Sequence, residues 1–206
     1  YRYEMTNRAG AVVYDGTTYF GFFSYRALAE QIGVREATLY EPSAGETARG
    51  RALEVPRLAP FSDDTMRMVD RVDSLILDGG RKNLGFVTGS IKVDPSMWFF
   101  AAQFHQDPVW PGSLGLEAML QLLKVVAVSR WDLGPEAVFA TMPIGHRHRW
   151  IYRGQVIPTN TRVEVQATVT SVDDERQTLI ADGFLCVDGL TIYEMRDFAL
   201  SARPSQ

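Results

Sequence analysis

The stretch from residue 113 to about 130 constrains the fold most, because it is the one convincing long helix and it is apolar on nearly every face. Ser113 follows Pro111-Gly112 and is predicted to cap this helix. A helix that is apolar all round has to be buried all round. The apolar residues that cover it are Leu114, Leu116, Met119, Leu120, Leu122, Leu123, Val125 and Val126.

The segments around this helix have the character of β-strands. Residues 66–77 and 84–93 alternate in polarity and are separated by Asp78-Gly79-Gly80, which predicts two strands joined by a turn. Further strands are expected at 136–142, 148–157, 161–172, 176–187 and 190–200. We therefore expect an α+β fold in which a long antiparallel sheet wraps around a central buried helix at about 113–130.

Two segments near opposite ends of the chain have the pattern of a β-hairpin. Residues 9–23 place Asp15-Gly16 between two apolar runs, and residues 182–199 do the same with Asp188-Gly189. The similarity is either coincidence or an internal repeat whose first copy survives only as its last hairpin. Ser24 is a plausible cap for a helix that ends at Gly33, and the Pro- and Gly-rich residues 41–60 are predicted to be a linker.

Composition excludes several classes of function. The chain has 206 residues, which is enough for one good-sized core, and its net charge of −4 without a basic stripe disfavours nucleic acid as a partner. The single cysteine, Cys186, rules out an internal disulfide framework and fits the reducing cytoplasm. We expect no membrane span, and an N-terminus without an initiator Met or a signal-peptide pattern is interpreted as a cut through a longer chain.

Glu117 lies one turn into the buried helix and is the main candidate for chemistry. Burial disfavours a charged carboxylate, so such a group can hold a proton near neutral pH and act as a general acid. The positive end of the helix dipole opposes this by favouring the anion. Just before it, Gly112 and Ser113 offer free backbone N–H groups that could bind an oxyanion or a thioester carbonyl. A carboxylate that simply reaches solvent is the alternative interpretation.

The stretch WFFAAQFHQDPVWPGSLGLEAMLQLLKVV, residues 98–126, resembles the active-site segment of hot-dog-fold 3-hydroxyacyl-[acyl-carrier-protein] dehydratases. More narrowly, it is similar to the dehydratase domains of polyunsaturated fatty acid and polyketide-type synthases. The segments at 66–80, 153–165 and 181–198 follow in that family's order, and 19–37 resembles the connection between two successive hot-dog units. The resemblance implies a trailing hairpin of a preceding unit (1–23), an N-terminal helix and linker (24–60) and a hot-dog domain (61–206).

The resemblance also implies a reaction and its partners. A 3-hydroxyacyl thioester, carried on the phosphopantetheine of an acyl carrier protein, loses water to give a trans-2-enoyl thioester without any further cofactor. A histidine takes the α-proton and an acidic residue on the central helix helps the hydroxyl leave. By this resemblance Glu117 is the acid, Gly112 polarises the carbonyl, Val109 and Ser113 flank it as substrate-binding positions, and Gln121 is a polar neighbour. Hot-dog units of this family pair, so a second unit is the other expected partner.

The histidine of the family pattern is missing. It should stand four residues before Asp107, where this chain has Gln103, and His105 lies two residues out of register. A glutamine amide cannot accept a proton near neutral pH, and in an extended segment His105 would lie about 7 Å from position 103. The domain is therefore either a dehydratase that uses His105 or a residue of a paired unit, or a degenerate unit that binds acyl chains or supports an active one.

Two weaker alternatives complete the sequence-based hypotheses. A hot-dog domain could also bind or hydrolyse acyl thioesters without dehydrating them. His146 and His148 could share a strand face, but no third ligand is evident, so no metal site is expected.

Overall fold

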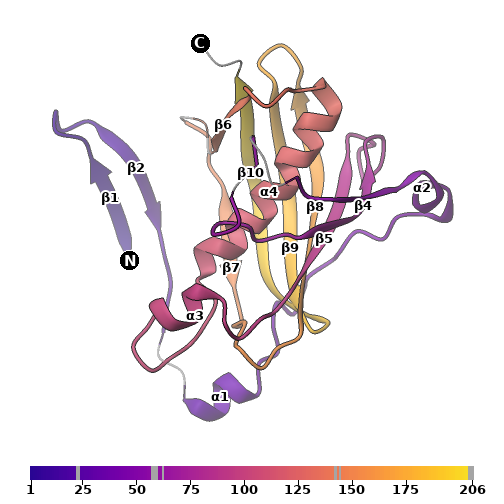
Figure 1. The fold of residues 1–206 in the computed structure, drawn as a ribbon. Helices are drawn as coiled ribbons and strands as arrows, with labels where there is room; N and C mark the ends of the chain where they lie inside the picture. The colour runs from indigo at the N-terminus through magenta and orange to yellow at the C-terminus, as the bar shows by residue number, and fades with distance from the viewer. Residues whose placement is uncertain (22–23, 57–59, 62, 142, 144, 204–206) are drawn as a thin grey trace. The chain divides into compact units, whose positions relative to one another are not determined.

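The structure is a computed structural model, and it describes residues 1–21, 24–56, 60–61, 63–141, 143 and 145–203. The chain divides into two compact units, Tyr1–Gln31 and Ile32–Gln206. Figure 1 shows the elements of both units.

The N-terminal unit contains a hairpin and a short helix. Strand β1 (Arg2–Thr6) pairs antiparallel with β2 (Val12–Thr17), and α1 (Tyr25–Ala29) follows. The predicted turn at Asp15-Gly16 is wrong: both residues lie inside β2. The chain reverses instead between the strands, where the Asn7 side chain accepts hydrogen bonds from the N–H groups of Ala9 and Ala11.

Gly16 has a packing role in place of the predicted turn role. It pairs with Tyr3 across the hairpin, and a Cβ at this position would lie 2.5 Å from the Tyr3 hydroxyl oxygen. The predicted cap of α1 is confirmed, because the Ser24 side chain accepts a hydrogen bond from the N–H of Ala27. The helix is shorter than predicted, since it ends at Ala29 and does not extend to Gly33. Residues 22–23 of the predicted first hairpin lie outside the described residues.

An antiparallel sheet forms most of the second unit. Its strand order is β3-β4-β5-β8-β9-β10-β6, and β7 also pairs with β10. The strands are β3 (Arg51–Glu54), β4 (Arg71–Ile76), β5 (Phe86–Lys92), β6 (Val138–Thr141), β7 (Arg149–Tyr152), β8 (Arg162–Asp173), β9 (Thr178–Val187) and β10 (Leu190–Arg203). Each strand expected in this unit has a counterpart, although β4, β6 and β7 are shorter than predicted.

The segment predicted to be a linker, 41–60, contains regular secondary structure. It contains helix α2 (Ala44–Arg49) and strand β3, which pairs with β4 at one end of the sheet. Helix α2 begins with a capping box in which the Ser43 and Glu46 side chains bind each other's backbone N–H groups. The linker was predicted from the prolines and glycines of this segment, and the capping signal of Ser43 and Glu46 was missed. Residues 57–59 lie outside the description.

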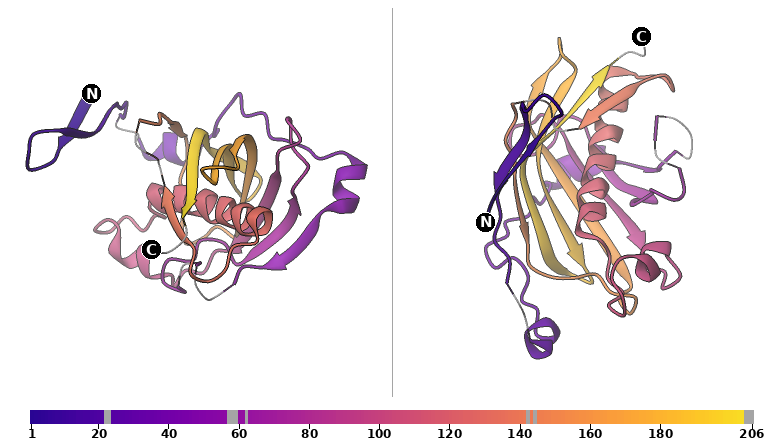
Figure 2. Two further views of the ribbon diagram at one scale, coloured as in Figure 1. Left: turned by 90° about the horizontal axis from the view of Figure 1, so that it is seen from above. Right: turned by 90° about the vertical axis from the view of Figure 1, so that its left-hand side faces the viewer.

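Helix α4 (Gly112–Trp131) lies against one face of the sheet, as predicted (Figures 1 and 2). Its apolar side chains pack on β5, β8, β9 and β10, and Met119, Leu122, Leu123 and Val126 have no exposed surface. By length and composition alone α4 would also meet the requirement for a membrane span, but 61% of that window is buried inside the protein. This burial identifies α4 as a core helix. A shorter helix, α3 (Trp98–Ala102), precedes it.

The start of α4 differs from the prediction. Its N-cap is Pro111, not Ser113, and no side chain caps it. The N–H of Leu114 donates to the carbonyl of Pro111, so the helix already begins at Gly112 and Ser113 stands exposed in its first turn. The fixed φ of proline explains the earlier start.

The second predicted hairpin is confirmed. Asp188 and Gly189 join β9 to β10 with φ values of 47° and 85°, as a two-residue turn of this type requires. The Asp188 carboxylate accepts hydrogen bonds from Asn160, Thr161 and Arg162, which ties the turn to the start of β8.

Candidate active site on helix α4

A polar stripe runs along helix α4 and contains Glu117. Gln121 and Lys124 lie one and two turns further on, so the three side chains share a face. The Gln121 Nε2 donates to Glu117 Oε1 at 2.9 Å, and the Lys124 ammonium lies 3.3 Å from the same oxygen. The Glu117 side chain is 21% exposed. The carboxylate is therefore paired and hydrogen-bonded but still accessible. These interactions offset the free-energy cost of burying its charge.

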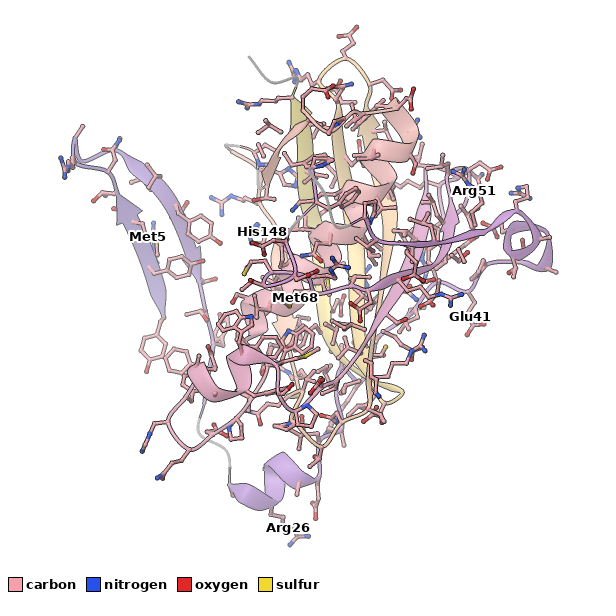
Figure 3. The ribbon with its side chains drawn as sticks, viewed as in Figure 1. Met5, Arg26, Glu41, Arg51, Met68 and His148 are labelled. Atoms are coloured by element: carbon pink, nitrogen blue, oxygen red, sulfur yellow. The ribbon has the colours of Figure 1, made fainter. Side chains whose placement is uncertain are left out.

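Gln121 joins this stripe to the segment before β4. It is 2% exposed, its Oε1 accepts from the N–H of Met68 at 2.9 Å, and its Nε2 also donates to the carbonyl of Met66 at 2.7 Å. Figure 3 labels Met68 beside α4. Gln121 therefore orients the Glu117 carboxylate and anchors the segment before β4, so it acts as a positioning residue in this structure.

The first turn of α4 lies under aromatic side chains. A Cβ on Gly112 would lie 3.0 Å from Trp150 and 3.2 Å from Tyr152, which are both on β7. Of the predicted substrate-binding positions, Val109 is buried with 3% exposure and Ser113 is exposed. The N–H groups of a helix's first turn have no acceptor within the helix, so Gly112 and Ser113 can donate to a ligand oxygen.

Gln103 and His105 lie in a turn between α3 and α4. Gln103 is the C-cap of α3 and its N–H donates to the carbonyl of Phe99 at 2.9 Å. The chain then turns through Gln106, whose φ is 60°, so the extended spacing assumed from the sequence does not apply. His105 is exposed, and its side chain makes no hydrogen bond or ion pair with the residues that the structure describes.

The structure places the other two histidines outside the strands. Both precede β7, so they do not share a strand face as the sequence suggested. His146 Nε2 lies 2.5 Å from the carbonyl oxygen of Asp197. Burial, and then the charge of His146, lowers the pKa of His148 below its usual value. No cluster of three or more potential metal ligands occurs within the described ranges.

Three residues of this region were missed by the sequence analysis. Lys124 follows Glu117 at a spacing that places both on one helix face, and this spacing could have revealed it. Tyr152 and Tyr193 come together through the pairing of β7 with β10, at the register Tyr193↔Tyr152. No local pattern could have indicated that pair.

Residues 61–196 match the sequence model of the FabA-like domain. The chain belongs to this family. It is also 34% identical over 211 residues to one subunit of the polyunsaturated fatty acid synthase of Thraustochytrium sp., a match that covers 90% of this chain and 14% of that protein. The chain thus spans about a seventh of that relative's length.

Among solved structures, the FabA-like chain is similar to the dehydratase heterocomplex ApeI:P from Xenorhabdus doucetiae. The TM-score is 0.51 at 16% identity, and the match covers 76% of this chain and 93% of that one. The hot-dog fold expected from the sequence is therefore confirmed, as an antiparallel sheet around one central helix.

Proposed function

We propose that this FabA-like domain dehydrates 3-hydroxyacyl thioesters on an acyl carrier protein to trans-2-enoyl thioesters, as part of a multidomain fatty acid or polyketide-type synthase in the cytoplasm. The observation that carries the proposal is Glu117, which lies partly exposed on the core helix of a FabA-like fold with its carboxylate held by Gln121 and Lys124. A carboxyl group in that place can deliver a proton to a leaving hydroxyl.

The reaction needs three operations and no cofactor beyond the phosphopantetheine that carries the acyl chain. A base removes a proton from C2, the bond between C3 and its hydroxyl oxygen breaks, and Glu117 gives that oxygen a proton so that it leaves as water. The N–H groups at the first turn of α4, from Gly112 and Ser113, polarise the thioester carbonyl and stabilise the charge that develops on its oxygen. Gln121 and Lys124 orient the Glu117 carboxyl group.

The geometry of α4 favours a site that is shared between two hot-dog units. Glu117 follows Gly112 by five positions. At 3.6 residues per turn and 1.5 Å rise per residue, the two residues point in directions about 140° apart and lie about 7.5 Å apart along the helix axis. A short substrate held at the first turn therefore does not reach Glu117 of the same helix directly. We infer that the base, or the acid, comes from a second unit, supplied by the parent chain or by a second copy.

A non-catalytic hot-dog unit is the second candidate function, and Gln103 favours it. A glutamine at the position of the family's base cannot take a proton, and His105 lies exposed in a turn. Such a unit would retain acyl binding and support an active partner.

Turnover of a short 3-hydroxyacyl pantetheine thioester by the full chain separates these functions. The product is followed by the absorbance of its conjugated double bond, for the wild-type chain and for Glu117→Gln, His105→Ala and Gln103→His. Glu164→Gln, which changes a half-exposed carboxylate on β8, is the matched control.

If the domain is a dehydratase, Glu117→Gln lowers turnover about a hundred- to ten-thousand-fold, whereas Glu164→Gln does not. Loss of turnover in His105→Ala assigns the base to His105. Turnover in Gln103→His alone, with none in the wild type, shows a degenerate unit and contradicts the proposal.

A further inference from the structure

Three aromatic side chains gather over the first turn of α4. Trp150 and Tyr152 come from β7 and Tyr193 from β10, so the pairing of these strands brings them together. The ring centroids of Trp150 and Tyr152 lie 5.9 Å apart, and those of Tyr152 and Tyr193 lie 4.6 Å apart. Tyr193 is fully buried, whereas Tyr152 is partly exposed and Trp150 is 39% exposed. The cluster thus extends from the core to the surface.

Two glycines let these rings approach the helix. Gly112 and Gly115 are three residues apart and so share one face of α4. Where a Gly115 Cβ would stand, Tyr193 Cε2 is 2.1 Å away and Cδ2 is 2.7 Å away. The Tyr193 ring therefore lies with its Cε2–Cδ2 edge against the helix. Tyr152 approaches the helix at Gly112, within the first turn, where backbone N–H groups are free.

The Tyr193 hydroxyl is buried without a proper acceptor. It has no hydrogen-bond partner in the structure as described. The two tyrosines do affect each other: burial first, and then Tyr152, raises the pKa of Tyr193 well above its usual value. Buried polar groups without partners are rare in native proteins and call for an explanation, such as an absent ligand.

We propose that Tyr152, with Tyr193 behind it, donates a hydrogen bond to the carbonyl oxygen of the acyl thioester at the first turn of α4. Tyr152 is the residue that touches the ligand, because it is partly exposed and lies against Gly112. Tyr193 is a positioning residue. When the Tyr152 hydroxyl donates its hydrogen bond to the ligand, the Tyr152 oxygen can accept a hydrogen bond from the Tyr193 hydroxyl. A neutral phenol is a donor suited to a carbonyl oxygen that gains negative charge.

This inference rests on the proposed function only for the class of ligand, an acyl thioester. It assigns to the two tyrosines a role in binding the carbonyl oxygen that does not depend on Gln103 or His105. It also separates carbonyl binding, which belongs to this face of α4, from the Glu117 carboxyl group on a different face.

The test uses a saturated acyl pantetheine thioester labelled with ¹³C at its carbonyl, which binds but cannot lose water. Its infrared carbonyl band is recorded free and bound to the full wild-type chain, together with the dissociation constant. The variants are Tyr152→Phe and Tyr193→Phe. Tyr40→Phe is the matched control, because it removes a partly buried hydroxyl that binds Glu46 on α2.

We expect the bound carbonyl band to shift to lower frequency in the wild type and in Tyr40→Phe. Tyr152→Phe should lose most of this shift and bind the thioester about two- to tenfold more weakly, and Tyr193→Phe should lose part of it. The melting temperature of free Tyr193→Phe should stay equal or rise, because this change removes a buried donor that lacks an acceptor.

An unchanged band in Tyr152→Phe overturns the proposal, as does a Tyr193→Phe chain that melts lower while binding normally. A wild-type chain with no bound thioester overturns it as well. If the band shifts as expected but the wild type dehydrates no 3-hydroxyacyl thioester, the carbonyl site stands and the dehydratase function fails. The two proposals therefore fail separately.

Discussion

Helix α4 packs closely against a side chain of the sheet at Gly115. A Cβ there would overlap the Tyr193 ring, with 2.1 Å to Cε2, and Tyr193 is fully buried between β7 and the helix. We expect Gly115→Ala to lower the free energy of unfolding by about 1–3 kcal/mol, as other overpacked cores do. Urea denaturation measures this. Gly45→Ala in α2, where the nearest atom is 3.8 Å away, should be neutral or stabilising.

Gln121 has two structural roles: it orients Glu117 and it anchors the segment before β4. Gln121→Leu keeps the volume but leaves the buried N–H of Met68 without its acceptor. An unpaired buried donor costs about 1–3 kcal/mol, and urea denaturation should show that loss. Glu117→Gln retains the contacts of Gln121 with Met66 and Met68 and should cost less. Equal losses in the two variants would show that Gln121 does not anchor this segment.

At the scale of residues, the sequence predicted which positions of α4 matter for the site but not which side chains from other elements contact them. Glu117 and Gly112 stood out because a carboxylate in an apolar helix and a Pro-Gly helix start are local signals. Tyr152 and Tyr193 are far apart in the chain and meet only through the pairing of β7 with β10. The prediction that Ser113 caps the helix was wrong for a local reason: Pro111 is the N-cap, and the helix starts directly after it.

At the scale of elements, helix α2 depends on one carboxylate. Glu46 accepts hydrogen bonds from the Tyr40 hydroxyl, from Ser43 and from the N–H of Gly80. The Tyr40 hydroxyl is the largest of the influences that lower the pKa of Glu46 from 4.5 to about 2. A lowered pKa means that this stabilisation is present above pH 4.5 and is lost as the pH falls toward 2.

We therefore expect Glu46→Gln to lower the melting temperature near neutral pH and to match the wild type at about pH 2, in thermal unfolding followed from about pH 2 to 7. Tyr40→Phe removes the largest of these interactions and so brings the folded-state pKa of Glu46 closer to 4.5. Its acid-induced loss should therefore begin at about the same pH as in the wild type but be smaller and be complete at a higher pH. A constant difference between Glu46→Gln and the wild type at every pH would exclude this role of Glu46.

The two Asp-Gly dipeptides show what decides a turn at this scale. Asp188-Gly189 forms one, with both residues at positive φ and the Asp188 carboxylate bound by the start of β8. Asp15-Gly16 has the same two residue types but lies within β2, where the Tyr3 ring covers Gly16. The deciding neighbours are Tyr3 in β1 and Asn7 in the turn that follows it. A search for Asp-Gly pairs alone does not consider these earlier residues.

At the scale of the molecule, the sheet of the second unit ends on one side at β6 and β7. These short strands pair with opposite ends of β10 and form an edge that offers unpaired backbone groups. The same edge carries Trp150 and Tyr152, which cover the first turn of α4. A second hot-dog unit that pairs here would close the edge and approach the helix start, where the proposed carbonyl site needs an acid or base from outside.

Val138 offers a way to test that pairing. It is 54% exposed on β6, where a lysine can point to solvent in a single unit but would oppose a close strand-to-strand contact. We expect the wild-type chain to form a dimer in light scattering, and Val138→Lys to be monomeric at the same concentration with turnover reduced alongside. Val12→Lys in the N-terminal hairpin, at a position 53% exposed, should remain dimeric. A wild-type chain that is monomeric and fully active would contradict a site shared between two units.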